Sequence, residues 1–498
     1  MERSPVTVVL GQIDHGKSTL LDYIRKTKIA EGEAGGITQA VSAYEITHHG
    51  KNITFIDTPG HEAFSSMREH GSAVADIAIL VVSAEDGVKS QTLEAKIAIE
   101  KNNLPYLVAI SKIDKPNANP ERVKQNLLEN GILLEGLGGS VPWMAISAKT
   151  GTGVSDLLDL LLVAAEVAEP KNDDSPVNGW SANGFILEAM IDSKKGIAAG
   201  AIIRGGTLRR GDYLAGAGDF FRVRKLENFL GRDVAELAAG RPAVIYGWSA
   251  VPAAGACWHT SQDKVAAESL ARSNLIEGSP LQIPKDYPQK PLAEDSNETV
   301  VPLIIKTDTL GTLAAIKKEI QKLIAPSIKI QILAARVGAI TENDVKLASA
   351  DRETIIVGFN VKIEKAAKNL AAKHQITYAV FDIIYKLSEW LETELDKRRP
   401  IVEIETVLGT AKIIKLFSQT KNKQIVGGLA LDGRIVDGRP VRIKRRESLL
   451  GEGEILELRQ QQTKVNQVEK GKQFGALVKS RHLLAPGDLL EIFQIEKK

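Results

Sequence analysis

The chain has 498 residues, of which 43% are hydrophobic and 25% are charged, and its formal net charge is +2. This composition excludes wholesale disorder, and the length predicts roughly three to four domains. No apolar run approaches the ~18 residues that cross a bilayer, and residues 1–5 lead directly into a strand-like segment without a signal peptide. We therefore expect a cytoplasmic protein with no membrane partner. The single cysteine, Cys257, cannot form an internal disulfide and is expected to be a small core residue.

The first part of the chain, residues 1–168, alternates two kinds of segment. Apolar runs rich in β-branched residues occur at residues 6–10, 53–56, 77–82 and 106–110, and helix-like segments occur at 91–100 and 154–167. Strands that alternate with helices predict a parallel α/β sheet. The polar stretch 169–178 contains two prolines and no periodicity, which indicates a linker.

Three further domains are expected. Residues 179–262 carry short apolar runs punctuated by glycine, the pattern of a small antiparallel β-barrel, and a connection follows at 263–297. The β/α alternation returns in residues 298–395, and a connecting helix over 385–399 is expected to stop before Pro400. Residues 400–498 are again strand-like and predict a second β-barrel.

The closing segment is the most basic part of the chain. From Lys397 to the end there are about 21 lysines and arginines against about 12 acidic residues, so the remainder is slightly acidic. Such a local excess attracts phosphate backbones, although a solvated basic face without a partner is an equally good interpretation of the charge alone.

A phosphate-binding loop is predicted between the strand at 6–10 and the helix-like segment at 19–26. Its pattern, with the required strand and helix on either side, is formed by Gly11, Gln12, Ile13, Asp14, His15, Gly16, Lys17, Ser18 and Thr19. In such a loop the backbone N–H groups surround the phosphates, Lys17 reaches the β and γ phosphates, and Ser18 ligates Mg²⁺.

A second motif follows the strand at 53–56 and consists of Asp57, Thr58, Pro59, Gly60 and His61. Asp57 is placed beside the phosphate loop and is expected to hold Mg²⁺ through water. Gly60 can present its N–H to a γ-phosphate, and His61 is the candidate that positions the attacking water. Thr38, in the glycine-rich stretch 33–38, is a candidate second Mg²⁺ ligand that leaves when the phosphate leaves.

Two further segments sit at strand ends, where open α/β sheets bind ligands. They are Ser111, Lys112, Ile113 and Asp114, and then Ser147, Ala148 and Lys149. The Asp114 carboxylate can accept two N–H donors from guanine that adenine does not supply, which favours GTP over ATP.

With these five segments in order, the sequence resembles the translational GTPases. The motifs Asp-His-Gly-Lys at 14–17 and Asp-Thr-Pro-Gly-His at 57–61 are specific to that family. The segments 33–38, 60–64 and 83–92 resemble bacterial-type translation initiation factor 2 in particular. The resemblance extends from Val6 onward, without the long amino-terminal extension common in that family. It implies a multidomain α/β and β fold: a P-loop GTPase domain, a β-barrel, a three-layer α/β domain, a long connecting helix and a second β-barrel.

The resemblance also implies a function. Such a factor, with GTP and Mg²⁺, helps initiator tRNA settle on the small ribosomal subunit, promotes subunit joining, and leaves after ribosome-stimulated hydrolysis. His61 matches the catalytic histidine of the family, Ile13 and Ile37 match a hydrophobic gate beside it, and Asp14 matches a position implicated in binding a monovalent cation. A monomer is expected off the ribosome.

The sequence departs from the family at two places. The guanine motif normally begins with asparagine, whose amide braces the base and the phosphate loop, and here Ser111 stands there. In the closing barrel, Arg459, Gln460 and Gln461, and then Gln473 and Phe474, replace residues usual around the formyl-methionine pocket, and Gly428 replaces a cysteine. Formyl-methionine recognition is therefore not carried over.

Two alternatives to an initiation factor remain. One is an elongation-type GTPase that delivers aminoacyl-tRNA, although that family places a barrel directly after its second domain, where this chain predicts α/β structure. The other is a ribosome-binding regulatory or assembly GTPase, and the altered residues of the closing barrel are the main observation in its favour.

Overall fold

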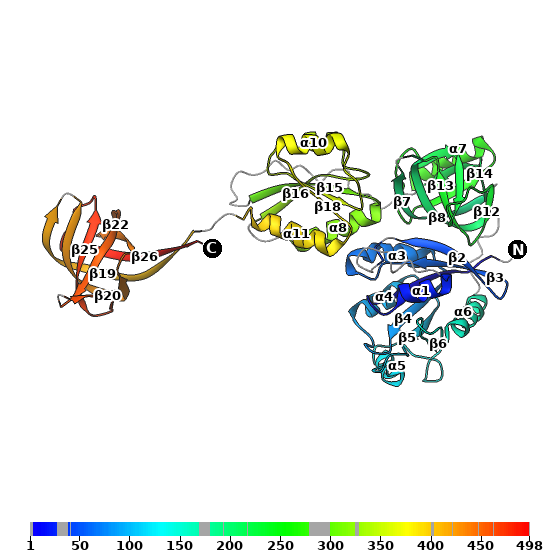
Figure 1. The fold of residues 1–498 in the computed structure, drawn as a ribbon, viewed down its shortest axis with the longest axis horizontal. Coiled ribbons are helices and arrows are strands. Elements are labelled where there is room, and N and C mark those ends of the chain that lie inside the picture. The colour runs from blue at the N-terminus through cyan, green and yellow to red at the C-terminus, as the bar shows by residue number, and fades with distance from the viewer. Residues whose placement is uncertain are drawn as a thin grey trace. The chain divides into compact units, whose positions relative to one another are not determined.

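The computed structural model describes residues 3–26, 38–39, 41–168, 180–192, 194–216, 218–277, 299–323, 328–399, 403–420, 422–446, 448–461 and 463–497. The chain divides into two compact units, Met1–Arg398 and Arg399–Lys498. Three sheets belong to the first unit and one to the second (Figure 1). Among the described residues, no helix is both long enough and apolar enough to cross a membrane.

The first sheet has six strands in the order β2-β3-β1-β4-β5-β6, all parallel to their neighbours except β2, which is antiparallel to β3. The strands are β1 (Val6–Gly11), β2 (Ser42–His48), β3 (Lys51–Asp57), β4 (Ile77–Ser83), β5 (Tyr106–Ser111) and β6 (Trp143–Ala145). The helices are α1 (Lys17–Arg25), the short 3₁₀ helix η2 (Glu62–Phe64), α3 (Ser65–Val74), α4 (Ser90–Lys101), α5 (Pro120–Glu129) and α6 (Val154–Val167). The central strands β1 and β4 are buried at every residue, as expected where helices cover both faces.

Helices cover both faces of this first sheet. Leu20 and Leu21 of α1 and Leu157 and Leu161 of α6 pack on one face, and apolar residues of α3, α4 and α5 pack on the other. Strands β1, β3 and β5 end at Gly11, Asp57 and Ser111, so the three predicted nucleotide motifs begin at one edge of the sheet.

The second sheet is antiparallel and barrel-like, with the order β10-β9-β14-β7-β8-β13-β11 and β12 paired to β8. Its strands are β7 (Ala182–Asp192), β8 (Gly196–Arg209), β9 (Tyr213–Gly216), β10 (Asp219–Arg222), β11 (Lys225–Asn228), β12 (Glu236–Ala238), β13 (Pro242–Tyr246) and β14 (Cys257–Ser261), and helix α7 (Lys264–Glu277) follows.

Cys257 is exposed, so its expected place in a core was wrong. It is the first residue of β14, and the next residue, Trp258, is fully buried. Because successive side chains of a strand point to opposite faces, the buried tryptophan directs the cysteine outward.

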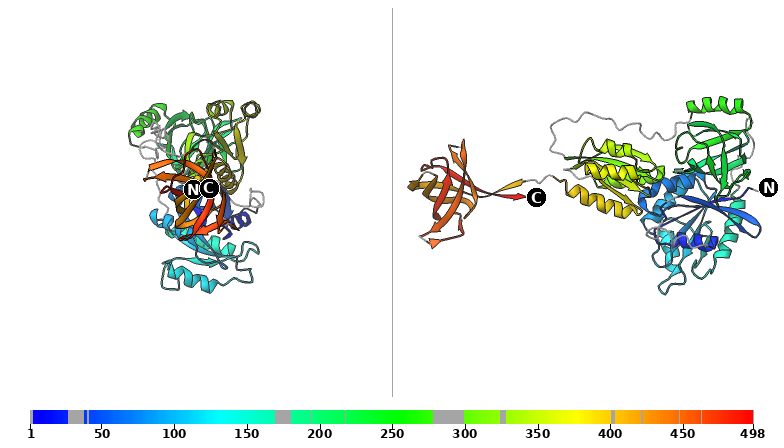
Figure 2. Two further views of the ribbon diagram at one scale, coloured as in Figure 1. Left: turned by 90° about the vertical axis from the view of Figure 1, so that its left-hand side faces the viewer. Right: turned by 45° about the horizontal axis from the view of Figure 1, so that its top comes forward.

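The third sheet has four parallel strands in the order β16-β15-β17-β18 and forms the middle of three layers (Figures 1 and 2). The strands are β15 (Thr299–Thr307), β16 (Ile328–Val337), β17 (Ile355–Phe359) and β18 (Thr377–Phe381), and the helices are α8 (Leu310–Lys322), α9 (Glu342–Ala348), α10 (Lys365–His374) and α11 (Ile384–Asp396). Helices α8 and α11 pack on one face of the sheet, and α9 and α10 pack on the other.

Helix α11 occupies most of the range expected for a connecting helix, but it ends at Asp396 rather than at residue 399. Its residues Leu387, Leu391 and Leu395 are fully or almost fully buried in the core of the third sheet. Their spacing of four residues places them on one face of the helix. Helix α11 therefore packs against the third sheet along its whole length.

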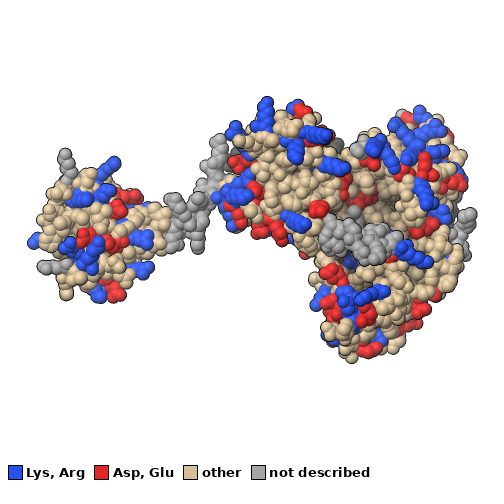
Figure 3. Space-filling view, in the orientation of Figure 1, with Lys and Arg blue, Asp and Glu red and all other residues tan. Residues whose placement is uncertain are grey.

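The second unit is a closed antiparallel barrel (Figures 1 and 2). Its strands are β19 (Glu403–Thr420), β20 (Lys423–Val436), β21 (Pro440–Arg445), β22 (Ser448–Gln460), β23 (Thr463–Lys464), β24 (Gln467–Glu469), β25 (Gln473–Ser480) and β26 (Leu489–Lys497). The order β19-β26-β21-β22-β25-β20 closes because β20 also pairs with β19. On the face in Figure 3, basic side chains of this unit are interspersed with acidic ones rather than gathered in one patch.

Candidate functional site

The phosphate loop runs from the end of β1 to the start of α1. Gly11 has a φ of 144°, and a Cβ there would lie 2.4 Å from the Val81 carbonyl oxygen, so only glycine fits. Gly16 caps the amino end of α1 with a φ of 87°. Both positions agree with the tight loop that the sequence predicts.

Lys17 is buried, and its ammonium donates to the carbonyl oxygens of Gly11 at 3.0 Å and Gln12 at 2.7 Å. Burial lowers the pKa of Lys17 to about 8, an effect that the nearby Asp57 opposes. A desolvated cation at the start of a helix is stabilised by an anion, so this cradle fits a phosphate group.

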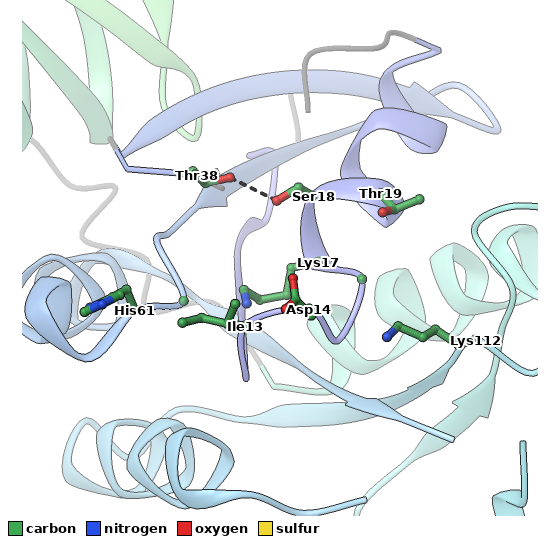
Figure 4. Close-up of a pocket in the computed structure, with 10 residues that line it drawn as sticks. Ile13, Asp14, Lys17, Ser18, Thr19, Thr38, His61 and Lys112 are labelled. Atoms are coloured by element: carbon green, nitrogen blue, oxygen red, sulfur yellow. Dashed lines mark hydrogen bonds between the residues drawn. The ribbon is translucent and has the colours of Figure 1, made fainter. Parts of the chain in front are cut away.

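The hydroxyl oxygens of Ser18 and Thr38 lie 2.9 Å apart (Figure 4). Mg²⁺ binds six oxygens at 2.0–2.1 Å in octahedral geometry, which separates neighbouring ligands by about 2.9 Å. The two hydroxyls therefore fit adjacent positions around one Mg²⁺ ion. Asp57 is buried at the end of β3, and Ile37 and the glycines before Thr38 lie outside the described residues.

Gly60 approaches the phosphate loop closely. A Cβ on Gly60 would lie 2.6 Å from the Lys17 ammonium and 3.3 Å from Ile13. Thr58 is fully buried, and its hydroxyl donates to the Val9 carbonyl oxygen at 3.0 Å, which fixes this loop to β1.

His61 points away from Lys17 and Asp14 (Figure 4). Its Nδ1 accepts a hydrogen bond from the Ala63 N–H at 2.9 Å, and its ring centroid lies 4.5 Å from that of Tyr385, the second residue of α11. Burial lowers the pKa of His61, so the ring is neutral at pH 7 with its proton on Nε2.

The segment after His61 shares a core with the third sheet. Ala63, Phe64 and Met67 are buried in the same cluster as the apolar faces of α8 and α11. Lys318 of α8 also donates to the Glu62 carbonyl oxygen at 3.1 Å. The position of His61 is therefore set by side chains more than 200 residues away along the chain, which the sequence motifs did not indicate.

Two more contacts join the segment that follows Thr38 to other parts of the first unit. The Gln39 side chain donates to the Asp382 carbonyl oxygen at 2.8 Å and accepts from the Ile384 N–H at 3.2 Å. The Val41 N–H donates to a Glu188 carboxylate oxygen at 3.1 Å. Sequence reasoning missed Gln39 and Glu188, because neither belongs to a nucleotide motif.

Ser111 retains a link to the phosphate loop. Its hydroxyl donates to the His15 carbonyl oxygen at 2.5 Å, so one hydrogen bond braces the loop where an asparagine is usual. His15 is itself buried, and its Nδ1 accepts from the Ser83 N–H at 3.3 Å. Burial lowers the pKa of His15 to about 4, so this ring is neutral and structural.

The predicted guanine residues lie together at the ends of β5 and β6. The Ser147 hydroxyl donates to an Asp114 carboxylate oxygen at 2.7 Å, which lowers the pKa of that carboxyl group. The Ile113 N–H donates to the Ile146 carbonyl oxygen at 3.3 Å and joins the two motifs. Ala148 and Lys149 follow Ser147 directly. The carboxylate is thus ionised and oriented for N–H donors.

Residues from four of the five predicted motifs line one pocket of about 180 Å³ (Figure 4), and the motif at 147–149 is not among them. The lining residues are Ile13, Asp14, Gly16, Lys17, Ser18, Thr19, Thr38, Gly60, His61 and Lys112. The pocket therefore combines the phosphate loop with the predicted metal and catalytic residues.

The structure of the second unit gives a physical reason for glycine at position 428, where a cysteine is usual in the family. Gly428 of β20 pairs with Phe474 of β25, and a Cβ on Gly428 would lie 2.7 Å from the Phe474 ring. Phe474 is buried, so its ring occupies the space of a side chain at 428. Arg459 and Gln460 end the neighbouring strand β22, Gln461 follows with a φ of 49°, and Gln473 begins β25.

Three family models match the chain. The elongation factor Tu GTP binding domain matches residues 2–166, elongation factor G domain 2 matches 181–259, and translation-initiation factor 2 matches 289–392. A curated relative, translation initiation factor IF-2 of Proteus vulgaris, is 36% identical over 99% of this chain and 54% of its own length. The chain thus spans about half the length of that relative.

Two solved structures also match. The crystal structure of GDP-bound aIF5B from Aeropyrum pernix is 26% identical, with a TM-score of 0.47 over 99% of this chain and 92% of that one. A bacterial selenocysteine-specific elongation factor, EF-Sec, is 21% identical, with a TM-score of 0.42 over 52% of this chain and 45% of that one. The three family models and the relative at 36% identity agree with the sequence motifs, and the chain belongs to the translational GTPases, with translation initiation factor IF-2 as its relative along 99% of its length.

Proposed function

We propose that this chain is a GTP-hydrolysing translation initiation factor. In this role it assists the binding of initiator tRNA to the small ribosomal subunit and the joining of the two subunits in the cytoplasm. One observation carries the proposal: the Ser18 and Thr38 hydroxyls lie 2.9 Å apart beside the buried ammonium of Lys17. The similarity to IF-2 over 99% of the chain supports initiation as the step of translation in which the chain acts. The nucleotide domain is then residues 1–168, followed by domains at 179–262, 298–395 and 400–498.

The phosphate end of the site binds charge. Lys17 and the N–H groups of the loop bind the phosphates, and Ser18 and Thr38 hold Mg²⁺ with Asp57 behind it. Bound Mg²⁺ neutralises charge on the β and γ phosphates. Asp14, with a φ of 62°, lines the same pocket and is the residue proposed to face a monovalent cation.

The base end of the site selects guanine. Asp114 accepts the two N–H donors of guanine, while Lys112 and Lys149 flank the base. Adenine offers no matching pair of N–H donors to this carboxylate. Ser147 supports this selection because its hydroxyl orients the carboxylate.

His61 is the proposed catalytic residue, and it orients the attacking water. In the described position its ring packs against Tyr385 and faces away from the phosphate loop. Hydrolysis therefore requires the ring to leave Tyr385 and turn toward the γ-phosphate. We therefore expect a slow reaction alone and a fast reaction on the ribosome, the partner proposed to drive the turn.

Purified protein mixed with GTP, Mg²⁺ and both ribosomal subunits tests the proposal. We expect hydrolysis to rise strongly when ribosomes are added, and subunit joining to be faster with GTP than with GDP. Ribosomes that leave the hydrolysis rate unchanged would overturn the function, even if GTP binds.

The same preparation separates the alternatives. An elongation-type factor would bind elongator aminoacyl-tRNA in preference to initiator tRNA, and an assembly GTPase would bind ribosomal subunits without accelerating their joining. A comparison of formylated, unformylated and uncharged initiator tRNA tests the closing barrel. Because Phe474 fills the space above Gly428, we expect little preference for the formyl group.

A further inference from the structure

A group of metal-binding side chains lies outside the nucleotide pocket, where helix α6 meets the hairpin of β2 and β3. His48 is the last residue of β2, His49 follows in the turn, and Asp159 is on α6. Within the part of the chain that the structure describes, this is the group of histidine and carboxylate side chains whose ligand atoms all lie within 4.8 Å of one another. None of the nucleotide motifs includes these three residues.

The distances suit one small transition-metal ion. His48 Nε2 lies 2.8 Å and His49 Nε2 lies 3.6 Å from the same Asp159 carboxylate oxygen. Around a tetrahedral zinc ion with ligands at 2.0–2.2 Å, neighbouring ligand atoms are about 3.4 Å apart. The two distances lie on either side of that value, and all three ligand atoms lie within 4.8 Å of one another.

The backbone holds the two imidazoles together. His49 has a φ of 47° and Gly50 a φ of 78°, the left-handed pair of a tight hairpin turn. The two rings lie with centroids 4.2 Å apart. His48 is mostly buried with 14% of its side chain exposed, whereas His49 is 70% exposed, so the ion would bind at the surface and keep a position open to water.

The donor set selects the metal. Two imidazole nitrogens and one carboxylate oxygen are ligands of zinc, nickel and copper, whereas Mg²⁺ prefers oxygen alone. This site is therefore chemically distinct from the proposed Mg²⁺ site at Ser18 and Thr38.

We propose that His48, His49 and Asp159 form a zinc-type metal site that ties the β2–β3 hairpin to α6. β2 begins at Ser42, four residues after Thr38, and β3 ends at Asp57. Metal binding would thus fix the hairpin turn of β2 and β3, which lies at the opposite end of these strands from Ser42 and Asp57. A hydrogen bond between His48 and Asp159 alone would also join hairpin and helix, but it needs no contribution from His49.

Zinc titration of the full chain without a histidine tag tests the site. The protein is first freed of metals with a chelator and then saturated with Mg²⁺ and GDP, so that the nucleotide pocket is filled. We expect one zinc ion per chain with a dissociation constant in the micromolar range. Cobalt in place of zinc is expected to give the visible absorption of a tetrahedral centre.

Two variants and a matched control decide the result. His49→Ala and Asp159→Asn are expected to weaken zinc binding at least tenfold, and zinc should slow hydrogen exchange in residues 42–57 of the wild-type chain only. His374→Ala removes an exposed histidine of α10 and should leave zinc affinity unchanged. The proposal is overturned if the wild-type chain binds zinc only at millimolar concentration, or if His49→Ala binds as tightly as wild type. Neither result would bear on GTP hydrolysis.

Discussion

Glu188 gives the sharpest test of the packing within the first unit. This carboxyl group is 7% exposed on β7, where it accepts from the Val41 N–H, and Asp308 is nearby. Burial, with repulsion from Asp308, raises the pKa of Glu188 to about 7 from an ordinary value of 4.5. The folded protein therefore retains a proton on this group at pH values where the unfolded chain has lost it.

The sign and size of the effect follow from linkage. Because the folded pKa lies above the unfolded one, the contribution of Glu188 to stability falls as pH rises from about 4.5 to about 7, and it is constant above that range. A shift of about 2.5 units at 1.36 kcal/mol each corresponds to about 3 kcal/mol. Glu188→Gln cannot ionise, and its amide oxygen can still accept from Val41.

The assay compares unfolding of wild type and Glu188→Gln at pH 5 and at pH 8. We expect the variant to gain about 2.5 kcal/mol relative to wild type between the two pH values, because pH 5 already lies slightly above the unfolded pKa, and this is seen as a rise of a few degrees in its relative unfolding temperature. Glu121→Gln, at a side chain that is 79% exposed, is the matched control and should follow wild type at both pH values. Parallel stability curves for wild type and Glu188→Gln would refute the reasoning.

Three further predictions concern the nucleotide site. His61→Ala should leave GTP affinity nearly unchanged and lower ribosome-stimulated turnover by about 10² or more, the scale for loss of a positioning or acid-base group, and an equal loss of binding would count against the assigned role. Ser111→Ala leaves the buried His15 carbonyl oxygen without its donor at 2.5 Å, a cost of about 1–2 kcal/mol that should weaken GDP and GTP binding roughly tenfold in a fluorescent-nucleotide titration; unaltered affinity would show that the bond does not brace the loop. Tyr385→Ala frees the His61 ring and should raise hydrolysis without ribosomes severalfold, whereas Tyr385→Phe keeps the ring contact and should behave as wild type; equal rates for all three proteins would contradict a restraining role.

The fold and the pocket follow from local sequence to different extents. The phosphate loop could be predicted because its spacing, the strand before it and the helix after it all lie within about 20 residues. Ser111 could be identified as a departure, but its bond to His15 joins positions 96 residues apart and needed coordinates. Cys257 was misplaced because its neighbour Trp258, rather than the character of the thiol, decides which side of β14 is buried.

Contacts between distant segments account for most of what the sequence could not supply. Nothing in the sequence around Tyr385 indicates its contact with His61. Likewise, nothing in the sequence around Gln39 indicates its hydrogen bonds at the start of α11. The same holds for α11, whose leucines have the spacing of an amphipathic helix without indicating which sheet they cover. Periodicity predicts that a face is buried, and the partner of that face depends on the tertiary fold.

The two hydrogen bonds of Gln39 have a thermodynamic consequence. Thr38, at the proposed metal site, and Gln39, bonded on both sides of the turn into α11, are adjacent in the chain. If a nucleotide changes the position of Thr38, it also changes the free energy of the Gln39 bonds. Linkage is reciprocal. If the nucleotide changes the affinity of α11 for a second ligand by some factor, that second ligand changes the affinity for the nucleotide by the same factor. A partner that binds α11 more tightly in one arrangement than in the other would then have an affinity that depends on which nucleotide is bound.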